Sequence, residues 1–137
     1  MKFKKIDSKD LAYFISIVGV ENVFTDSDSL ETYAHDETED LQYFPEVVLK
    51  PDTTEQVANI MLYCNQQIIS ITACGARTGL SGGSLPVCGG VALSTERLNS
   101  IIEIDERNLQ ATVEPGVINQ IFQEAVQEKG LYYPPDP

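Results

Sequence analysis

The stretch Gly75-Ala76-Arg77-Thr78-Gly79-Leu80-Ser81-Gly82-Gly83 decides how this sequence is interpreted. Glycines packed this densely permit positive φ angles and close backbone approach, so successive main-chain N–H groups can surround an anion. Thr78 and Ser81 add hydroxyl donors, and Arg77 adds the one full positive charge nearby. The stretch therefore predicts a phosphate-binding loop that holds a nucleotide cofactor.

The glycine spacing separates this loop from two common phosphate-binding motifs. Its glycines never form G-x-G-x-x-G, and no lysine followed by serine or threonine closes it as in a P-loop. Proline and glycine at positions 86, 89 and 90 exclude a long helix directly after it, so anion binding must depend on curled backbone rather than on a helix dipole. A flexible Gly/Ser connector is the alternative, although the loop lies between two apolar strand candidates.

Hydrophobic periodicity predicts an α+β fold with a small, mostly parallel sheet, flanking helices and an added antiparallel hairpin. A helix beginning near Ser8 should end at Gly19, and Thr53-x-x-Gln56 should cap a helix that places Val57, Ile60, Met61 and Cys64 on one face. We also expect a short helix from Asp28, strands at 46–50, 68–72 and 90–94, a hairpin of 101–104 with 110–113, and a helix from Val117 that closes at Gly130. Strand 68–72 is almost continuously apolar, which predicts cover on both of its faces.

Composition narrows the class of protein. The chain has 137 residues, is 42% hydrophobic and carries a formal charge of −12, which suits one compact domain and argues against nucleic acid or an anionic membrane as a partner. Neither a signal peptide nor an apolar run long enough to span a bilayer is found, so we expect a cytoplasmic protein. Seven acidic residues between Asp26 and Asp40 are interpreted as a solvated face, because a calcium loop would need a central glycine there.

Cysteine and histidine are too sparse for a metal centre. Cys64, Cys74 and Cys88 form no C-x-x-C pair and are interpreted as reduced thiols. His35, the sole histidine, lies in the acidic run and is interpreted as a surface residue rather than a base. The sequence therefore predicts no metal ligand and no catalytic residue within the chain.

Four motifs in a fixed order resemble one family. They are the segments 45–51, the glycine loop 75–83, Val113-Glu114-Pro115-Gly116-Val117 and the proline-rich end from Gly130 to Pro137. Together they resemble FAD-linked oxidases of the vanillyl-alcohol oxidase type, with a PCMH-type FAD-binding domain. Within that superfamily the chain is most similar to the glycolate oxidase FAD subunit and to FAD-dependent D-lactate and D-2-hydroxyglutarate dehydrogenases.

The resemblance implies an N-terminal FAD-binding subdomain over 45–137, preceded by a helical segment and acidic loop over 1–44. The glycine loop would wrap the FAD pyrophosphate, and two further segments would line the remaining cofactor path. The implied cofactor-binding residues are Gly75, Ala76, Arg77, Thr78, Gly79, Leu80, Ser81, Gly82, Pro115, Gly116, Val117, Pro134 and Pro135. For Pro134 and Pro135, an ordinary proline turn without cofactor contact remains an equal alternative.

Two positions depart from the family pattern. The family loop usually begins with Arg-Gly and has glycine at position 77, whereas this chain has Cys74 and Arg77. Arg77 would either strain the backbone there or bring the positive charge to phosphate from a new position. Family members that link flavin covalently use a histidine in this loop; none is present, so FAD should bind non-covalently.

The implied activity is transfer of hydride from a D-2-hydroxy acid, such as glycolate or D-lactate, to flavin. Such enzymes continue with a second flavin-binding half and a cap domain, so on this reading the chain is an incomplete part that is inactive alone. An apolar face that the rest would cover should favour self-association. Two alternatives stay open: a non-catalytic interaction domain that has lost flavin, and a sugar-nucleotide reductase of the same superfamily.

Overall fold

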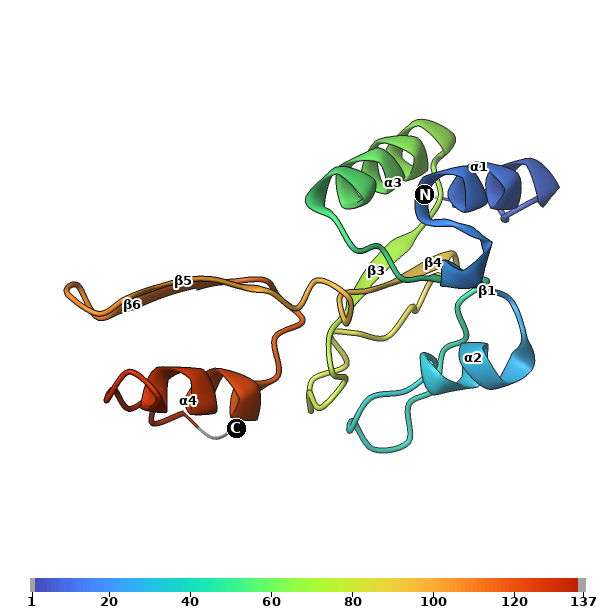
Figure 1. Cartoon of the computed structure of the whole chain (residues 1–137). Coiled ribbons are helices and arrows are strands. Elements are labelled where there is room, and N and C mark those ends of the chain that lie inside the picture. The colour runs from blue at the N-terminus through green and yellow to red at the C-terminus, as the bar shows by residue number, and fades with distance from the viewer. Residues whose placement is uncertain (1, 136–137) are drawn as a thin grey trace.

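The computed structural model describes residues 2–135, so the last two residues of the proline-rich motif lie outside the described part. The elements are α1 (Ser8–Val18), η1 (Val20–Asn22), β1 (Val23–Phe24), α2 (Ser27–Thr32), β2 (Val47–Leu49), α3 (Thr54–Gln67), β3 (Ile71–Cys74), β4 (Val91–Ser94), β5 (Ile101–Asp105), β6 (Gln110–Val113) and α4 (Asn119–Gln127). Figure 1 shows two parts: a body built on β1 to β4, and an arm formed by β5, β6 and α4.

The body contains a four-stranded sheet in the order β1-β2-β4-β3. Both β2 and β3 run parallel to β4, with Val48 and Thr72 each opposite Ala92, whereas β1 pairs antiparallel with β2. The predicted mostly parallel sheet is therefore confirmed. Because β1 precedes residue 45 and pairs with β2, the sheet draws strands from both sides of the predicted division at 44/45, which stays a prediction.

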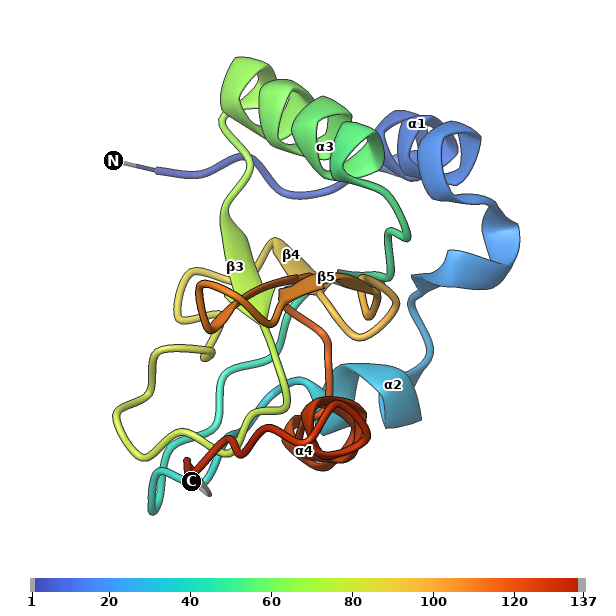
Figure 2. The same cartoon turned by 60° about the vertical axis from the view of Figure 1, so that its left-hand side comes forward.

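The two faces of the sheet bury different partners because side chains alternate along a strand. Val47, Leu49, Val91 and Leu93 point toward α1 and α3 and form the larger core with Phe14 and Ile60. On the opposite face, Val48, Ala92 and Cys74 pack with Tyr33, beside α2. Figures 1 and 2 show α1 and α3 on one side of the sheet and α2 on the other.

Helix α1 is held at both ends. The Asp7 side chain caps the amides of Lys9 and Asp10, and Gly19 ends the helix with φ 83°. Asp10 is fully buried, where it accepts from Lys4 Nζ at 2.7 Å and from the Tyr63 hydroxyl at 2.9 Å. This ion pair, whose carboxylate is buried and whose lysine is partly exposed, fixes the N-terminal segment against α1, and the Tyr63 hydroxyl joins it to α3.

Two predicted helix details are corrected. Helix α2 is capped by Asp26, whose carboxylate accepts from the Ser29 amide, rather than by Asp28. Helix α3 has the predicted Thr53 cap, but Met61 is exposed and does not share the buried face of Ile60 and Cys64. The helical apolar stripe is narrower than the sequence indicates, because α3 packs against the sheet on one side and solvent covers the other.

The second predicted strand also starts later than expected. Helix α3 runs to Gln67, and Ile68 adopts a left-handed C-cap conformation (φ 56°) that leaves its side chain exposed. Strand β3 therefore begins at Ile71, and it forms the edge of the sheet with Ala73 exposed. The expectation that this strand is covered on both faces is wrong; the strands buried at every residue are β2 and β4, which lie inside the sheet.

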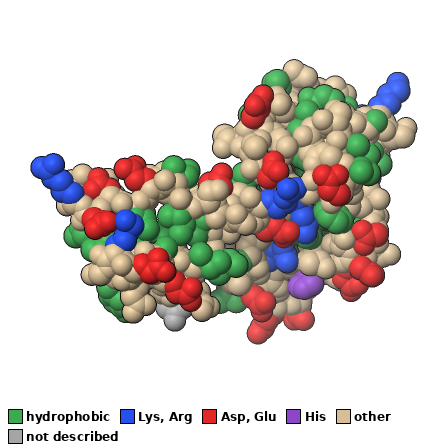
Figure 3. Space-filling view, viewed as in Figure 1, with side chains coloured by type: hydrophobic (Ala, Val, Ile, Leu, Met, Phe, Trp, Pro, Cys, Tyr) green, Lys and Arg blue, Asp and Glu red, His purple; other side chains and the backbone are tan. Residues whose placement is uncertain are grey.

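The arm is a hairpin with a helix beneath it (Figures 1 and 2). Strands β5 and β6 pair antiparallel as predicted, with Ile101 opposite Val113, and form a sheet of their own. Figure 3 shows hydrophobic side chains gathered over this region among acidic ones. Within residues 2–135, no helix is both long and apolar enough to cross a bilayer.

Candidate functional site

The glycine loop leaves the sheet at the carboxyl end of β3, as predicted. Its base is closed by Cys74, which precedes the loop and whose thiol lies 3.4 Å from the carbonyl oxygen of Ser84, just after it. Cys74 is fully buried, and burial raises its pKa to about 11, so the thiol stays neutral at physiological pH. A neutral donor at the base holds the two ends of the loop together without placing a charge in the core.

The backbone of the loop is curled rather than extended. Arg77 has φ 58° and Gly82 has φ 69°, both in the left-handed region. Within residues 2–135, only one amide of positions 75–83 has an acceptor: the Gly82 N–H donates to Thr38 Oγ1 at 2.8 Å. The other amides are available as donors, which is the condition for a backbone anion site.

A pocket of about 700 Å³ lies between the body and the arm. One wall is the first half of the loop, another is the segment that follows β4, and the third is the segment that leads from β6 into α4. The lining residues are Gly75, Ala76, Arg77, Thr78, Thr95, Glu96, Asn99, Pro115, Gly116, Val117, Ile118, Asn119 and Ile121. Seven predicted site residues, 75–78 and 115–117, are thus brought together although they are distant in sequence.

Gly116 sets the distance between the arm and the body. Its amide donates to the Leu98 carbonyl at 2.7 Å, and a Cβ atom at this position would overlap the carbonyl oxygens of Thr95 and Leu98. Glycine is required here because two backbone segments approach each other closely. The width of the pocket therefore depends on the absence of a side chain at Gly116.

The remaining predicted residues lie away from this pocket. Positions 79–82 form the outer half of the loop, where the Gly79 carbonyl accepts from the Glu37 amide and Leu80 is 76% exposed. Pro134 and Pro135 lie beside α4, and the Pro135 carbonyl accepts from the side chains of Asn119 and Gln123, each at 2.9 Å. Because Asn119 also lines the pocket, Pro135 adjoins the site through this one side chain.

Sequence reasoning missed several lining residues. Thr95, Glu96 and Asn99 follow directly after β4, at the carboxyl edge of the sheet. Ligands of open α/β sheets gather at that edge, so the end of the predicted strand 90–94 was the signal that could have identified them.

Arg77 gives the site its positive charge. Its guanidinium lies 4.2 Å from the centre of the Tyr33 ring, and no carboxylate among residues 2–135 forms a salt bridge with it. Arg77 lines the pocket, so its charge is not neutralised by a partner carboxylate within the described chain. In a chain of formal charge −12, such a cation favours an anionic ligand locally.

Glu96, the acidic residue of the pocket, is neutralised by a neighbour. Lys50 Nζ lies 2.6 Å from Glu96 Oε1, and the Tyr33 hydroxyl lies 2.9 Å from Glu96 Oε2. Burial alone would raise the pKa of Glu96, but the hydrogen bonds from Lys50 and Tyr33 lower it below its ordinary value. The carboxylate therefore stays ionised in an ion pair and offers little repulsion to a phosphate.

Histidine and cysteine do not form a metal centre in the described chain. No group of three or more His, Cys, Asp or Glu side chains is arranged to hold a metal ion within residues 2–135. His35 is exposed, with Nδ1 3.1 Å from the Glu31 carbonyl. Of the seven acidic residues at 26–40, Asp36 is buried, which corrects the prediction of a wholly solvated face.

Comparisons with known proteins agree with this geometry. The sequence profile of the FAD binding domain family matches residues 45–137. Glycolate oxidase subunit GlcD of Bacillus subtilis is 42% identical over 124 residues, which are 90% of this chain and 26% of that protein. D-2-hydroxyglutarate dehydrogenase of Stutzerimonas stutzeri is 35% identical over 88% of this chain and 26% of that protein. The chain thus spans about a quarter of the length of these relatives.

The fold has a solved counterpart. The structure of p-cresol methylhydroxylase with substrate bound matches 95% of this chain and 27% of that chain, with a TM-score of 0.82 and 29% sequence identity. This match confirms the expected PCMH-type fold, and the matching sequence profile confirms FAD as the cofactor. The chain belongs to the FAD-binding domain family of FAD-linked oxidoreductases, related to glycolate oxidase and D-2-hydroxyglutarate dehydrogenase.

Proposed function

We propose that the pocket between the glycine loop and residues 115–117 holds the FAD diphosphate. The observation that carries this proposal is the set of pocket-lining loop amides that have no acceptor among residues 2–135, beside an arginine that forms no salt bridge with those residues. The pocket, at about 700 Å³, is within the usual size of small-molecule sites. A ligand with two negative charges fits donors of this kind, since charge-assisted hydrogen bonds are stronger than neutral ones.

Each part of the loop has a separate task in this proposal. The amides of Gly75 to Thr78 and the hydroxyl of Thr78, which line the pocket, donate to phosphate oxygens, while the outer residues Gly79 to Gly82 keep the loop curled. Arg77 supplies a full charge from a left-handed backbone position that costs a non-glycine residue about 1 kcal/mol. Pro115, Gly116 and Val117 form the opposite wall, and Pro134 and Pro135 adjoin the cofactor path through Asn119. The loop contains no histidine, so FAD binding is non-covalent in this proposal.

We further propose that the bound cofactor serves oxidation of a D-2-hydroxy acid. The support is chemical: the names of two relatives, glycolate oxidase and D-2-hydroxyglutarate dehydrogenase, share a 2-hydroxy carboxylate substrate. Flavin supplies a hydride acceptor for such a carbinol carbon. This chain's own residues bind and orient the cofactor; Glu96, the acidic side chain at the pocket, is held in its ion pair with Lys50 and supplies no free base.

The cofactor site is tested by titrating the chain with FAD and comparing Arg77→Gly with Arg107→Gly. Arg107 lies in the exposed hairpin turn and is a matched loss of one charge far from the pocket. Arg77→Gly relieves the left-handed strain but removes the charge, so FAD affinity should fall about threefold to thirtyfold. Arg107→Gly should leave FAD affinity unchanged. A folded chain that carries no flavin absorbance after free FAD has been removed would refute the site. Equal FAD affinities for both variants would refute it as well.

The substrate class needs a separate measurement. Flavin bound to the natural polypeptide that carries this sequence should bleach anaerobically on addition of glycolate or D-2-hydroxyglutarate, but not of the corresponding acids without a 2-hydroxyl group. Bleaching by neither hydroxy acid, in a preparation that retains FAD, would reject the substrate class and leave the cofactor site standing.

A further inference from the structure

The outer half of the glycine loop is held by a turn from a distant part of the sequence. The Glu37 amide donates to the Gly79 carbonyl at 3.1 Å, and the Gly82 amide donates to Thr38 Oγ1 at 2.8 Å. The Ser84 hydroxyl donates to Asp36 Oδ2 at 3.3 Å. These contacts join the turn 36–38 to the loop, and the two segments lie side by side in Figures 1 and 2.

Asp36 makes this turn rigid. It is only 7% exposed, whereas the other six acidic residues at 26–40 are exposed. One carboxylate oxygen accepts from the Thr38 amide at 2.9 Å, and the other accepts from Ser84. The side chain and the amide of Thr38 lower the pKa of Asp36 below its ordinary value, so the carboxylate is ionised at neutral pH. An ionised acceptor strengthens both hydrogen bonds.

The same segment also positions the arginine of the loop. Tyr33 is 3% exposed, and its ring lies under the Arg77 guanidinium at 4.2 Å. Its hydroxyl lies 2.9 Å from Ser94 Oγ and from Glu96 Oε2, so the ring cannot turn away without losing buried hydrogen bonds. A cation stacked on a fixed ring has fewer conformations to lose when it meets an anion.

The contacts are made without occupying the donors that face the ligand. The turn consumes one loop amide, that of Gly82, which does not line the pocket. Its other contacts use a carbonyl and a hydroxyl, so the amides of 75–78 at the pocket keep no acceptor among residues 2–135. The loop is therefore braced from outside while its inner half stays open.

From these contacts we infer that Tyr33 and the turn 36–38 position the glycine loop of the FAD site. They lie outside the segment 45–137 that matches the FAD binding domain profile. The inference rests on the proposed function, because it takes the loop as the diphosphate site. In this view FAD affinity depends on a turn whose residue Thr38 does not line the pocket.

Three threonine variants test the inference. Thr38→Val removes the acceptor of the Gly82 amide at nearly constant shape, Thr38→Ser retains it, and Thr112→Val makes the same change on the exposed strand β6. We expect Thr38→Val to weaken FAD binding about threefold to tenfold, measured by quenching of flavin fluorescence. Hydrogen exchange at the Gly82 amide should accelerate about tenfold, while exchange in α3 stays unchanged. Thr38→Ser should restore both values.

Each failure has a distinct meaning. Equal FAD affinity and equal loop exchange in Thr38→Val and Thr112→Val would overturn the role of the turn while the FAD site survives. Thr38→Ser behaving like Thr38→Val would show that packing, not the hydroxyl acceptor, matters, and would also overturn it. Failure of the unaltered chain to bind FAD would refute the site itself, and the positioning role with it.

Discussion

Strands β4 and β6 have the same length, four residues each, but opposite surroundings. Every residue of β4 is buried, because it lies between two strands and two layers of helices, whereas every residue of β6 is exposed. In the arm, the rings of Phe122 and Tyr133 form an edge-to-face pair, and α4 lies beneath one face of the hairpin. In the described part of the chain, no helix covers the other face of the hairpin. Burial in this protein thus comes from neighbours in the sheet, and the arm has few.

The pocket at the junction has the properties of both parts. Its loop wall is anchored in the buried sheet, while its opposite wall belongs to the arm and is joined to the segment after β4 by the main-chain bond from Gly116 to Leu98. One wall is therefore rigid and the other can adjust. The variants below should separate these two contributions.

The largest effect is expected from the core of the body. Ile60 is fully buried, whereas the side chain of Ile121 in the arm is 53% exposed. Ile60→Ala should lower the free energy of unfolding by about 2–5 kcal/mol, because it leaves a cavity in a packed core. Ile121→Ala should change it by about 0.5 kcal/mol or less. Urea unfolding followed by circular dichroism measures both; similar losses would show that the arm is as well packed as the body.

A smaller loss is expected at the junction. Gly116→Ala places a methyl group against the carbonyl oxygens of Thr95 and Leu98, so the arm must move away from the body. The cost should be about 1–3 kcal/mol, with FAD affinity reduced in the same variant. Gly83→Ala is the matched control, since no atom lies within 4 Å of its added Cβ and its φ is not positive. If Gly83→Ala lost FAD binding while Gly116→Ala kept it, the close backbone approach at Gly116 would not control the site.

Acid should weaken the body through Asp10. Burial would raise its pKa, but hydrogen bonds from Lys4, the Asp7 amide and Tyr63 lower it below 3.8. A pKa lowered by folding gives stability that is complete above the unfolded value and is lost as the pH falls through the folded value. Asp10→Asn should cost about 1–2 kcal/mol near neutral pH and flatten the loss of stability as the pH falls below the ordinary aspartate pKa.

Asp105 is the control in the arm for this pH dependence. It accepts from the amides of Asn108 and Arg107, and these hydrogen bonds lower its pKa too, but the turn is exposed, so Asp105→Asn should change the free energy of unfolding and its pH dependence less than Asp10→Asn does. Unfolding curves over the acid range compare the two variants. An unchanged slope in Asp10→Asn would mean that other carboxylates control acid unfolding.

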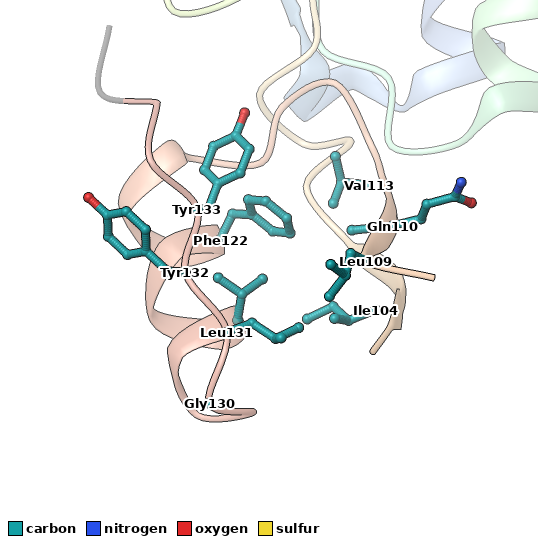
Figure 4. A pocket seen from close by; sticks show the side chains of 11 residues that line it. Ile104, Leu109, Gln110, Val113, Phe122, Gly130, Leu131, Tyr132 and Tyr133 are labelled. Atoms are coloured by element: carbon teal, nitrogen blue, oxygen red, sulfur yellow. The ribbon is translucent and has the colours of Figure 1, made fainter. Parts of the chain in front are cut away.

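The smallest change concerns association of the arm. A pocket of about 510 Å³ opens between the hairpin and α4, lined by apolar side chains that include Ile104, Phe122 and Leu131 (Figure 4). Ile102 and Leu109 nearby are 64% and 74% exposed. We expect the chain to self-associate weakly and Ile102→Thr to reduce association. Light scattering at rising concentration checks this; a monomer at all concentrations would contradict it.

Local signals predicted the elements whose partners are near in sequence. The hairpin follows from the turn residues after Asp105, and α1 from the helical pattern that begins near Ser8 and ends at Gly19, although the structure shows that its N-cap is Asp7. The start of β3 could not be read in this way. Ile68 is apolar and suits a strand, but α3 continues to Gln67, and the carbonyl of the left-handed cap residue Ile68 accepts from the Lys4 amide, which is distant in sequence.

The site was predicted in part for the same reason. The glycine loop is a local pattern, so its donors could be recognised, and the resemblance supplied Pro115 to Val117. Asp36 and Thr38 could not be found, because an acidic residue in an acidic run carries no signal of burial. Their role depends on contacts across 44 and 48 residues of sequence.

Amide NMR of the labelled chain during titration with FAD tests most directly whether the cofactor lies between the glycine loop and the arm. We predict saturable shift changes at the amides of Gly75 to Thr78 and of Gly116 and Val117, with α1 and the hairpin turn unaffected. Changes confined to the pocket between the hairpin and α4, or no saturable change in the loop, would contradict the proposed site.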